Sequence, residues 1–112
     1  MEPGGDRVSK FRLTPSAAQS KVRQLSASSS NLIFTRHIEQ RMSERGIDTD
    51  AVLRILRTGS VDDEPQPTEI EGDWKIKVTR IMPSGRTAGV VTVLVGKNQK
   101  LVLLTAEWED HR

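Results

Sequence analysis

The chain has 112 residues, a formal net charge of +2, a hydrophobic fraction of 35% and no cysteine. This length suits one domain and is too short for two, and the lack of cysteine excludes disulfides and thiolate metal sites. Two histidines, His37 and His111, argue against a histidine-bound metal, and no stretch approaches the roughly 20 apolar residues that cross a bilayer. We therefore predict a domain that needs no metal or cofactor and works in a reducing cytoplasm.

Three helices are predicted in the first half of the chain. Residues 1–13 mix glycine, proline and charges without apolar periodicity, which is typical of a flexible leader, and they lack the apolar region of a signal peptide. A single domain then spans residues 14–112. Capping residues and apolar spacing delimit the helices, with Thr14, Thr35 and Asp48 as N-caps, Gly46 ending the second helix and Gly59 ending the third.

Three strands are predicted after an acidic segment. Residues 60–73 contain six Asp or Glu and no Lys or Arg, whereas residues 74–112 contain seven Lys or Arg and three Asp or Glu. Residues 74–80 alternate apolar and polar side chains, and apolar runs at 90–95 and 101–106 follow across short turns. Connections this short make neighbouring strands antiparallel. The predicted fold class is α+β, with N-terminal helices packed on one face of a small antiparallel sheet.

The second predicted helix carries a cationic edge. At 100° per residue, Arg41 lies about 40° and Arg45 about 80° from His37, so these side chains border the apolar stripe of the helix. A solvated helix face with weak local ion pairs would explain the same residues. The alternative is a functional edge, where a neutral imidazole accepts a proton and the arginines bind phosphate.

Candidate ligand-binding residues also occur on the strands. Lys77 and Arg80 next to the helix edge would form a cationic cleft, which suits a phosphodiester. A solvated sheet face is the structural alternative for Lys75 and Lys77, whereas Arg80 follows the apolar parity of the strand. Four further residues are candidates for substrate contact beside Arg45, namely Lys75, Arg86, Thr105 and Trp108. Trp108 either covers the end of the sheet or stacks on a base, and the other three either solvate the strands and turn or contact a phosphate.

One motif carries a resemblance to a known family. The run His37-x-x-x-Arg41-Met42-x-x-Arg45-Gly46-Ile47, a helix ending at Gly59 and strands reaching a terminal Leu-Thr resemble a family of small bacterial domains of unknown function. That family is similar in layout to the MqsR and RelE toxins, which are ribosome-associated or free mRNA interferases. The similarity covers roughly residues 32–108.

The resemblance implies a metal-independent endoribonuclease on a barnase-type fold, the toxin of a toxin–antitoxin pair. A ribose 2′-OH would attack the adjacent phosphate, with His37 and Arg41 as the catalytic pair. Lys77 and Arg80 join this catalytic set through their placement on the strand. RNA, an antitoxin protein and the ribosome are the implied partners, without a membrane. The alternative function is a non-catalytic module that binds protein or nucleic acid through the same cationic face.

Overall fold

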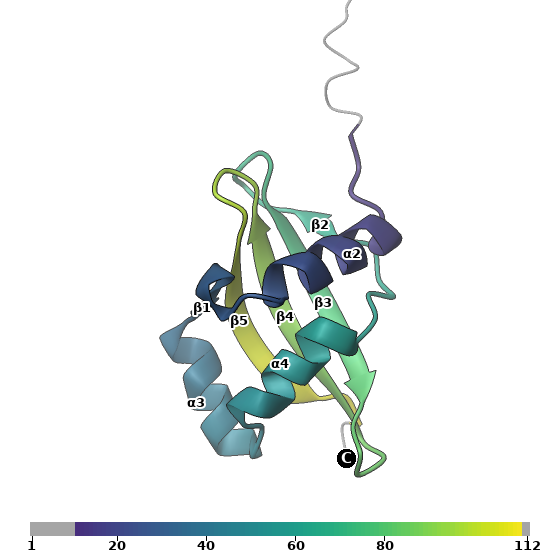
Figure 1. Ribbon diagram of the computed structural model, residues 1–112, viewed down its shortest axis with the longest axis vertical. Helices are drawn as coiled ribbons and strands as arrows, with labels where there is room; N and C mark the ends of the chain where they lie inside the picture. The colour runs from purple at the N-terminus through teal and green to yellow at the C-terminus, as the bar shows by residue number, and fades with distance from the viewer. Residues whose placement is uncertain (1–10, 111–112) are drawn as a thin grey trace, which may run out of the picture.

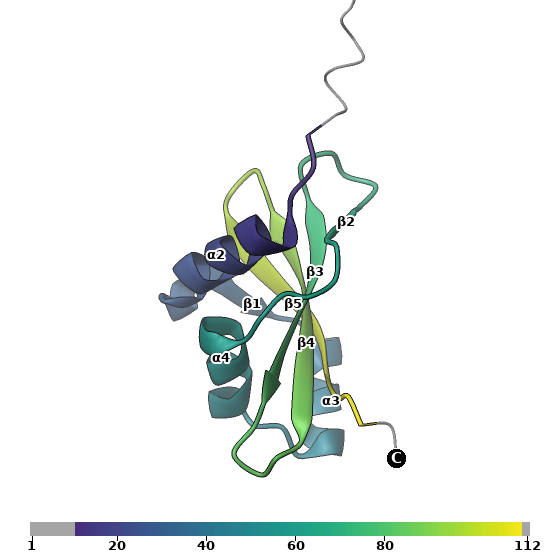
Figure 2. The same cartoon turned by 90° about the vertical axis from the view of Figure 1, so that its right-hand side faces the viewer.

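The computed structural model describes residues 11–110, with two helices on one face of a five-stranded sheet (Figure 1, Figure 2). The strand order is β1-β5-β4-β3-β2. No helix in this part of the chain is long and apolar enough to cross a membrane. In chain order the elements are α2 (Pro15–Ser26), a 3-10 turn (Ser29–Asn31), β1 (Leu32–Phe34), α3 (Arg36–Arg45), α4 (Thr49–Thr58), β2 (Gln66–Pro67), β3 (Trp74–Ile81), β4 (Thr87–Val95) and β5 (Lys100–Trp108).

The predicted α+β class is confirmed, and the sheet is mixed rather than wholly antiparallel. β3, β4 and β5 form the predicted antiparallel meander. β1 joins the outer side of β5 in parallel, with Leu32 opposite Leu101 and Phe34 opposite Leu103. A three-residue strand is too short to show an alternating pattern, and its partner lies far along the chain. For these reasons the sequence did not indicate it.

The three predicted helices begin at their predicted caps. The side chains of Thr14, Thr35 and Asp48 each accept a hydrogen bond from the backbone N–H three residues later, at 3.1, 3.1 and 2.8 Å. These bonds satisfy N–H groups that have no partner inside the helix. Gly46 ends α3 in the left-handed conformation, with φ of 67°, which a residue with a Cβ adopts at a cost.

Alternation along the strands separates two faces of the sheet. The face beneath α2 and α4 carries the buried side chains of the core, including Ile76, Val78, Val90, Thr92, Leu94, Leu101, Leu103 and Ala106. We call the other side the open face, and it carries Lys75, Lys77, Thr79, Val91, Val93, Thr105 and Glu107. A β-bulge keeps this order along β5. Because Val91 pairs with Thr105 and Thr92 pairs with Leu103, Leu104 is the extra residue.

α3 lies along the outer edge of β5, apart from the α2 and α4 layer (Figure 1, Figure 2). Thr35 fixes its start, since both its N–H, at 3.4 Å, and its hydroxyl, at 2.7 Å, donate to the carbonyl oxygen of Leu103. Arg45 fixes its end, where Nη1 donates to the carbonyl oxygen of Ala106 at 2.8 Å. Between these points Ile38 is fully buried. α3 therefore covers the part of the β5 edge that β1 does not pair.

The last residues of the predicted leader contact the domain. Phe11 packs edge to face on Trp74, with ring centroids 6.1 Å apart, and Leu13 packs against the core. The other leader residues, 1–10, lie outside the described part of the chain, as does His111. The domain boundary at residue 14 stays a prediction.

Candidate functional site

Arg80 and Lys77 project from opposite faces of β3. Lys77 lies on the open face, whereas Arg80 follows the buried positions of the strand toward the helices. Nε of Arg80 donates to the hydroxyl of Thr58 at 2.7 Å, and Nη1 donates to the carbonyl oxygen of Ile81 at 2.7 Å. The structure therefore does not bring Arg80 into one cleft with Lys77. Instead, Arg80 joins β3 to the end of α4.

His37 and Arg41 lie on the side of α3 that borders the open face. Ile38 is fully buried, and Met42, about 40° further round the helix, packs against the core beside Ile47. Arg41 and His37 lie about 60° and 100° from Ile38 in the opposite rotational direction. Because Met42 packs on the side of α3 toward Ile47 and the core, the rotation of the helix places Arg41 and His37 on the side toward the open face.

The three basic side chains of the α3 motif have different surroundings. His37 is exposed and forms no hydrogen bond or ion pair with the other described residues. Nη1 of Arg41 lies 2.7 Å from Oε1 of Glu44, and this bond holds the pKa of Glu44 below its usual value. Arg45 binds the edge of β5, as described above. We conclude that His37 and Arg41 are accessible to a ligand and that Arg45 is a structural residue.

Thr105 and Lys77 stand in one row across the sheet. Thr105 on β5 pairs with Val91 on β4, which pairs with Lys77 on β3. Strand spacing places the Cα atoms of Thr105 and Lys77 about 10 Å apart. β5 is the strand next to α3. Along the open face, the His37 and Arg41 edge of α3 is therefore followed by Thr105 and then by Lys77. We call His37, Arg41, Thr105 and Lys77 the candidate site. Lys75 lies on the same face, two residues before Lys77.

Lys77 is held by two carboxylates. Its Nζ lies 2.6 Å from Oε1 of Glu109 and 3.6 Å from Oε2 of Glu107. The hydrogen bond to Glu109 raises the pKa of Lys77, while partial burial acts in the opposite direction. Lys77 is thus a positioned cation at neutral pH. Its pocket of about 300 Å³ is also lined by acidic and hydroxyl side chains, namely Asp62, Asp63, Thr79, Thr87 and Glu109.

A glycine makes room for this ion pair. A Cβ at Gly89 would lie 2.7 Å from Oε2 of Glu109 and 3.3 Å from Cε of Lys77. Oε2 of Glu109 is buried without a hydrogen-bond partner in the described structure. The Lys77–Glu109 pair therefore lies tight against the backbone of β4, where its geometry depends on the missing side chain.

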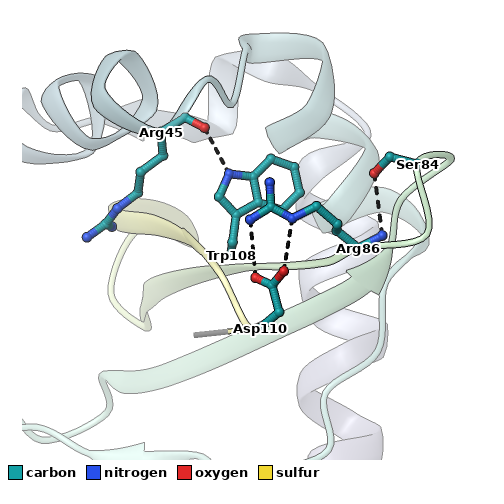
Figure 3. Close-up of polar contacts among 5 residues, drawn as sticks. All are labelled: Arg45, Ser84, Arg86, Trp108 and Asp110. Carbon is teal, nitrogen blue, oxygen red and sulfur yellow. Dashed lines mark hydrogen bonds and ion pairs between the residues drawn. The ribbon is translucent and has the colours of Figure 1, made fainter. Parts of the chain in front are cut away.

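Arg86 and Trp108 pack on each other at the end of the sheet, as Figure 3 shows. The Arg86 guanidinium lies 4.1 Å from the ring centroid of Trp108 and binds Asp110 with two hydrogen bonds, of 3.0 and 3.2 Å. The indole N–H of Trp108 donates to the carbonyl oxygen of Arg45 at 2.8 Å. One ring face and the indole N–H are therefore occupied. The cluster ties the end of β5 to the end of α3 and to the β3–β4 turn.

The two carboxylates that surround Lys77 were not predicted from the sequence. Glu107 and Glu109 follow Thr105 at two-residue intervals, so the period of the strand places all three on one face. That spacing was a usable signal. Within residues 11–110, no three side chains of His, Asp or Glu are arranged to hold a metal ion.

These features define an α+β domain whose open sheet face is bordered by a charged helix. The chain belongs to a family described as "Domain of unknown function (DUF4258)", which matches residues 34–108, well over half of the chain. The match begins at the end of β1 and includes α3, the meander and every residue of the candidate site. No curated protein and no solved structure matches the chain significantly.

Proposed function

We propose that this protein is a metal-independent endoribonuclease, the toxin of a bacterial toxin–antitoxin pair, and that its site lies where α3 meets the open face. The supporting observation is the row formed by the His37 and Arg41 edge, Thr105 and Lys77. These residues come from α3, β5 and β3, yet they border one stretch of surface. We exclude Arg80 from the catalytic residues and Arg45 from the substrate-binding residues, because both side chains stabilise the fold.

The proposed reaction is an intramolecular transesterification at a phosphodiester of RNA. The ribose 2′-oxygen attacks the adjacent phosphorus, the bond to the 5′-oxygen breaks, and a 2′,3′-cyclic phosphate forms. In its neutral form, His37 accepts the proton from the 2′-OH as the oxygen attacks. Arg41 and Lys77 stabilise the added negative charge of the phosphorane, and the Thr105 hydroxyl donates to a phosphate oxygen.

The ion pairs of the free protein are compatible with this role. Arg41 is partly buried and Glu44 is exposed, so water screens their ion pair and a phosphate can replace the carboxylate at small cost. Lys77 is fixed more firmly by Glu109, which positions its charge before substrate arrives.

The leaving 5′-oxygen receives its proton from the imidazolium that the first step creates or from solvent.

The α3 motif resembles a family of small bacterial domains that is similar in layout to the MqsR and RelE toxins, and this resemblance supports mRNA as the substrate class. The same resemblance supports an antitoxin protein as the partner, which would cover the open face. It also supports action in the cytoplasm, on ribosome-bound or free mRNA. The proposal needs no cofactor.

A cleavage assay tests the proposed activity. Purified protein is incubated with a defined single-stranded RNA at low salt and with a chelator, and the products are mapped. We expect cleavage that ends in cyclic phosphate, and loss of at least about 10²-fold in rate for His37→Ala and Arg41→Ala, the usual scale for such groups. Arg36→Ala is the matched control, because Arg36 lies on the outer side of α3. Intact RNA with folded wild-type protein would overturn the proposal.

A non-catalytic binding module is the second candidate function. It is favoured by the fact that Lys77 and Arg86 are already paired with carboxylates. Under this reading RNA remains intact, His37→Ala leaves binding unchanged, and charge reversal at Arg41 weakens binding. The same variants therefore separate the two functions.

A further inference from the structure

An apolar patch occupies the half of the open face farthest from Glu107 and Glu109, and it adjoins the candidate site at Val91. Ile33 on β1 pairs with Val102 on β5, which pairs with Val93 on β4. Ile33 is 46% exposed, and the valines are partly exposed. Val91 and Val95 flank Val93 on the same face. We call these five residues the apolar patch. Contiguous apolar surface of this kind is typical of interaction sites.

Lysines border the apolar patch. Lys75 continues the row beyond Val93, and Lys100 pairs with Val95 at the upper end. Lys75 is exposed and forms no hydrogen bond or ion pair within the described structure, whereas Nζ of Lys100 donates to the carbonyl oxygen of Ser30 at 3.2 Å. The strand residues of this half include no Asp or Glu. The patch is therefore apolar with a cationic rim.

No described helix covers the apolar patch. α2 and α4 pack on the other face of the sheet, and α3 runs along β5 beyond the end of β1 (Figure 2). The open-face residues in this half also include no aromatic side chain among the described strands. Single-stranded RNA is held by aromatic platforms on which its bases stack, so the patch favours a protein ligand over RNA. A second copy would bring two cationic rims together, which disfavours self-association.

We propose that the apolar patch docks an extended segment of a partner protein whose patch-facing side chains are aliphatic in the middle and acidic at the two ends. An extended segment presents alternate side chains to one side, which matches the flat surface of a sheet. Its aliphatic side chains would cover Ile33, Val93 and Val102. The acidic side chains at its ends, which face the same side, would pair with Lys75 and Lys100. The docking proposal does not require ribonuclease activity, although the docking surface meets the candidate site at Val91.

The probe is a short soluble peptide, labelled for fluorescence anisotropy, in which valines at alternate positions are separated by serines and are flanked in the same register by a glutamate at each end. The comparison peptide replaces each glutamate by lysine. We expect the acidic peptide to bind and to shift the amide NMR signals of Ile33, Val93 and Val102 in the unaltered protein. The lysine peptide should bind at least about tenfold more weakly, a difference of about 1.4 kcal/mol. Equal binding by both peptides, or shifts located elsewhere, would overturn the proposal.

Matched variants give a second measurement. Ile33→Glu should weaken binding of the acidic peptide at least about tenfold, whereas Ile81→Glu should not, although Ile81 is also an exposed isoleucine, at 66%. Likewise Lys75→Glu should weaken binding and Lys97→Glu should not. Circular dichroism checks that each variant folds. The proposal fails if Ile33→Glu behaves like Ile81→Glu, if single-stranded RNA shifts the patch signals instead, or if wild-type protein is a dimer that Ile33→Glu dissociates.

Discussion

Arg23 and Arg57 each cap the helix of the other. Nη2 of Arg23, on α2, donates to the carbonyl oxygens of Thr58 at 3.2 Å and Gly59 at 2.7 Å, where α4 ends. Nε of Arg57, on α4, donates to the carbonyl oxygen of Ser26 at 2.7 Å, where α2 ends. The last carbonyls of a helix have no partner within it and attract positive charge. Two of the chain's arginines therefore serve the fold, although their charge alone suggests a ligand site.

Removing either arginine should loosen the contact between α2 and α4. Arg23→Met and Arg57→Met keep the apolar stem and lose the donors, and each should lower the free energy of unfolding by about 1 kcal/mol. The double variant should depart from additivity by about 0.5 kcal/mol or more, because both bonds depend on the same helix contact. Urea denaturation measures all three. Arg54→Met is the control, and a loss there as large as at Arg57 would contradict this role.

Two glycines should differ sharply when replaced by alanine. A Cβ at Gly59 would lie 2.5 Å from the carbonyl oxygen of Ile55 and 2.6 Å from that of Thr79, so backbone would have to move. At Gly89 the nearest atom belongs to the flexible Glu109 side chain, which can move. We expect Gly59→Ala to cost about 3 kcal/mol and Gly89→Ala about 1 kcal/mol, following the usual scale of overpacking.

Thermal or urea unfolding compares the two variants. A Glu109→Ala background provides the control, since removing the clashing carboxylate should abolish most of the cost of Gly89→Ala and leave that of Gly59→Ala unchanged. An equal loss of unfolding free energy for both alanine variants in either background would contradict the different surroundings of the two glycines.

The Lys77–Glu109 pair should make stability sensitive to alkaline pH. The pKa of Lys77 is raised above its ordinary value of 10.5, mainly by the hydrogen bond to Glu109. A group with a raised pKa contributes stability that is complete below the unfolded value and is lost as pH rises through the folded value. Between about pH 9 and about pH 12, wild-type protein should therefore lose more stability than Lys77→Met.

Urea midpoints at several pH values across this range provide the measurement. Lys75→Met is the control for lysine removal, because Lys75 has no such partner and its loss should leave the alkaline decline of the wild type in place. Parallel pH curves for wild-type protein and Lys77→Met would show that the bond to Glu109 contributes nothing measurable.

Replacing Arg86 should uncover Trp108. A cation over an exposed ring contributes about 0.5–1 kcal/mol, so Arg86→Ala should lower stability by about that amount. It should also shift Trp108 fluorescence to longer wavelength as water reaches the ring, measured in a Trp74→Phe background so that one indole emits. Lys97→Ala, on the other hairpin turn, should change neither. An unchanged spectrum for Arg86→Ala would place the guanidinium away from the ring in solution.

Much of the fold followed from local signals. A cap acts within a few residues, so Thr14, Thr35 and Asp48 could be recognised from their neighbours, and the alternation at residues 74–80 identified β3. The pairing of β1 with β5 was not predictable in this way, because three residues carry no period and the partner is distant in sequence. The position of α3 depends on that pairing, so its place at the sheet edge was missed with it.

The candidate site was less predictable than the fold. The helix edge of His37 and Arg41 followed from the 3.6-residue period, and strand parity already separated Lys77 from Arg80. The sequence around each Lys or Arg could not indicate whether a carboxylate from a distant segment neutralises its charge. Lys77 meets Glu109, and Arg86 meets Asp110, only because the register of β3, β4 and β5 brings distant segments together.

The position of α3 also bears on how this protein behaves when it is crowded. An uncovered strand edge recruits strands from other molecules, which leads to fibres or exchanged segments. Here a helix, held by Thr35 and Arg45 at its two ends, keeps the lower half of β5 from doing so. A change that detaches α3, for which loss of the Arg45 side chain is a candidate, should expose this part of β5 to pairing with strands of other molecules.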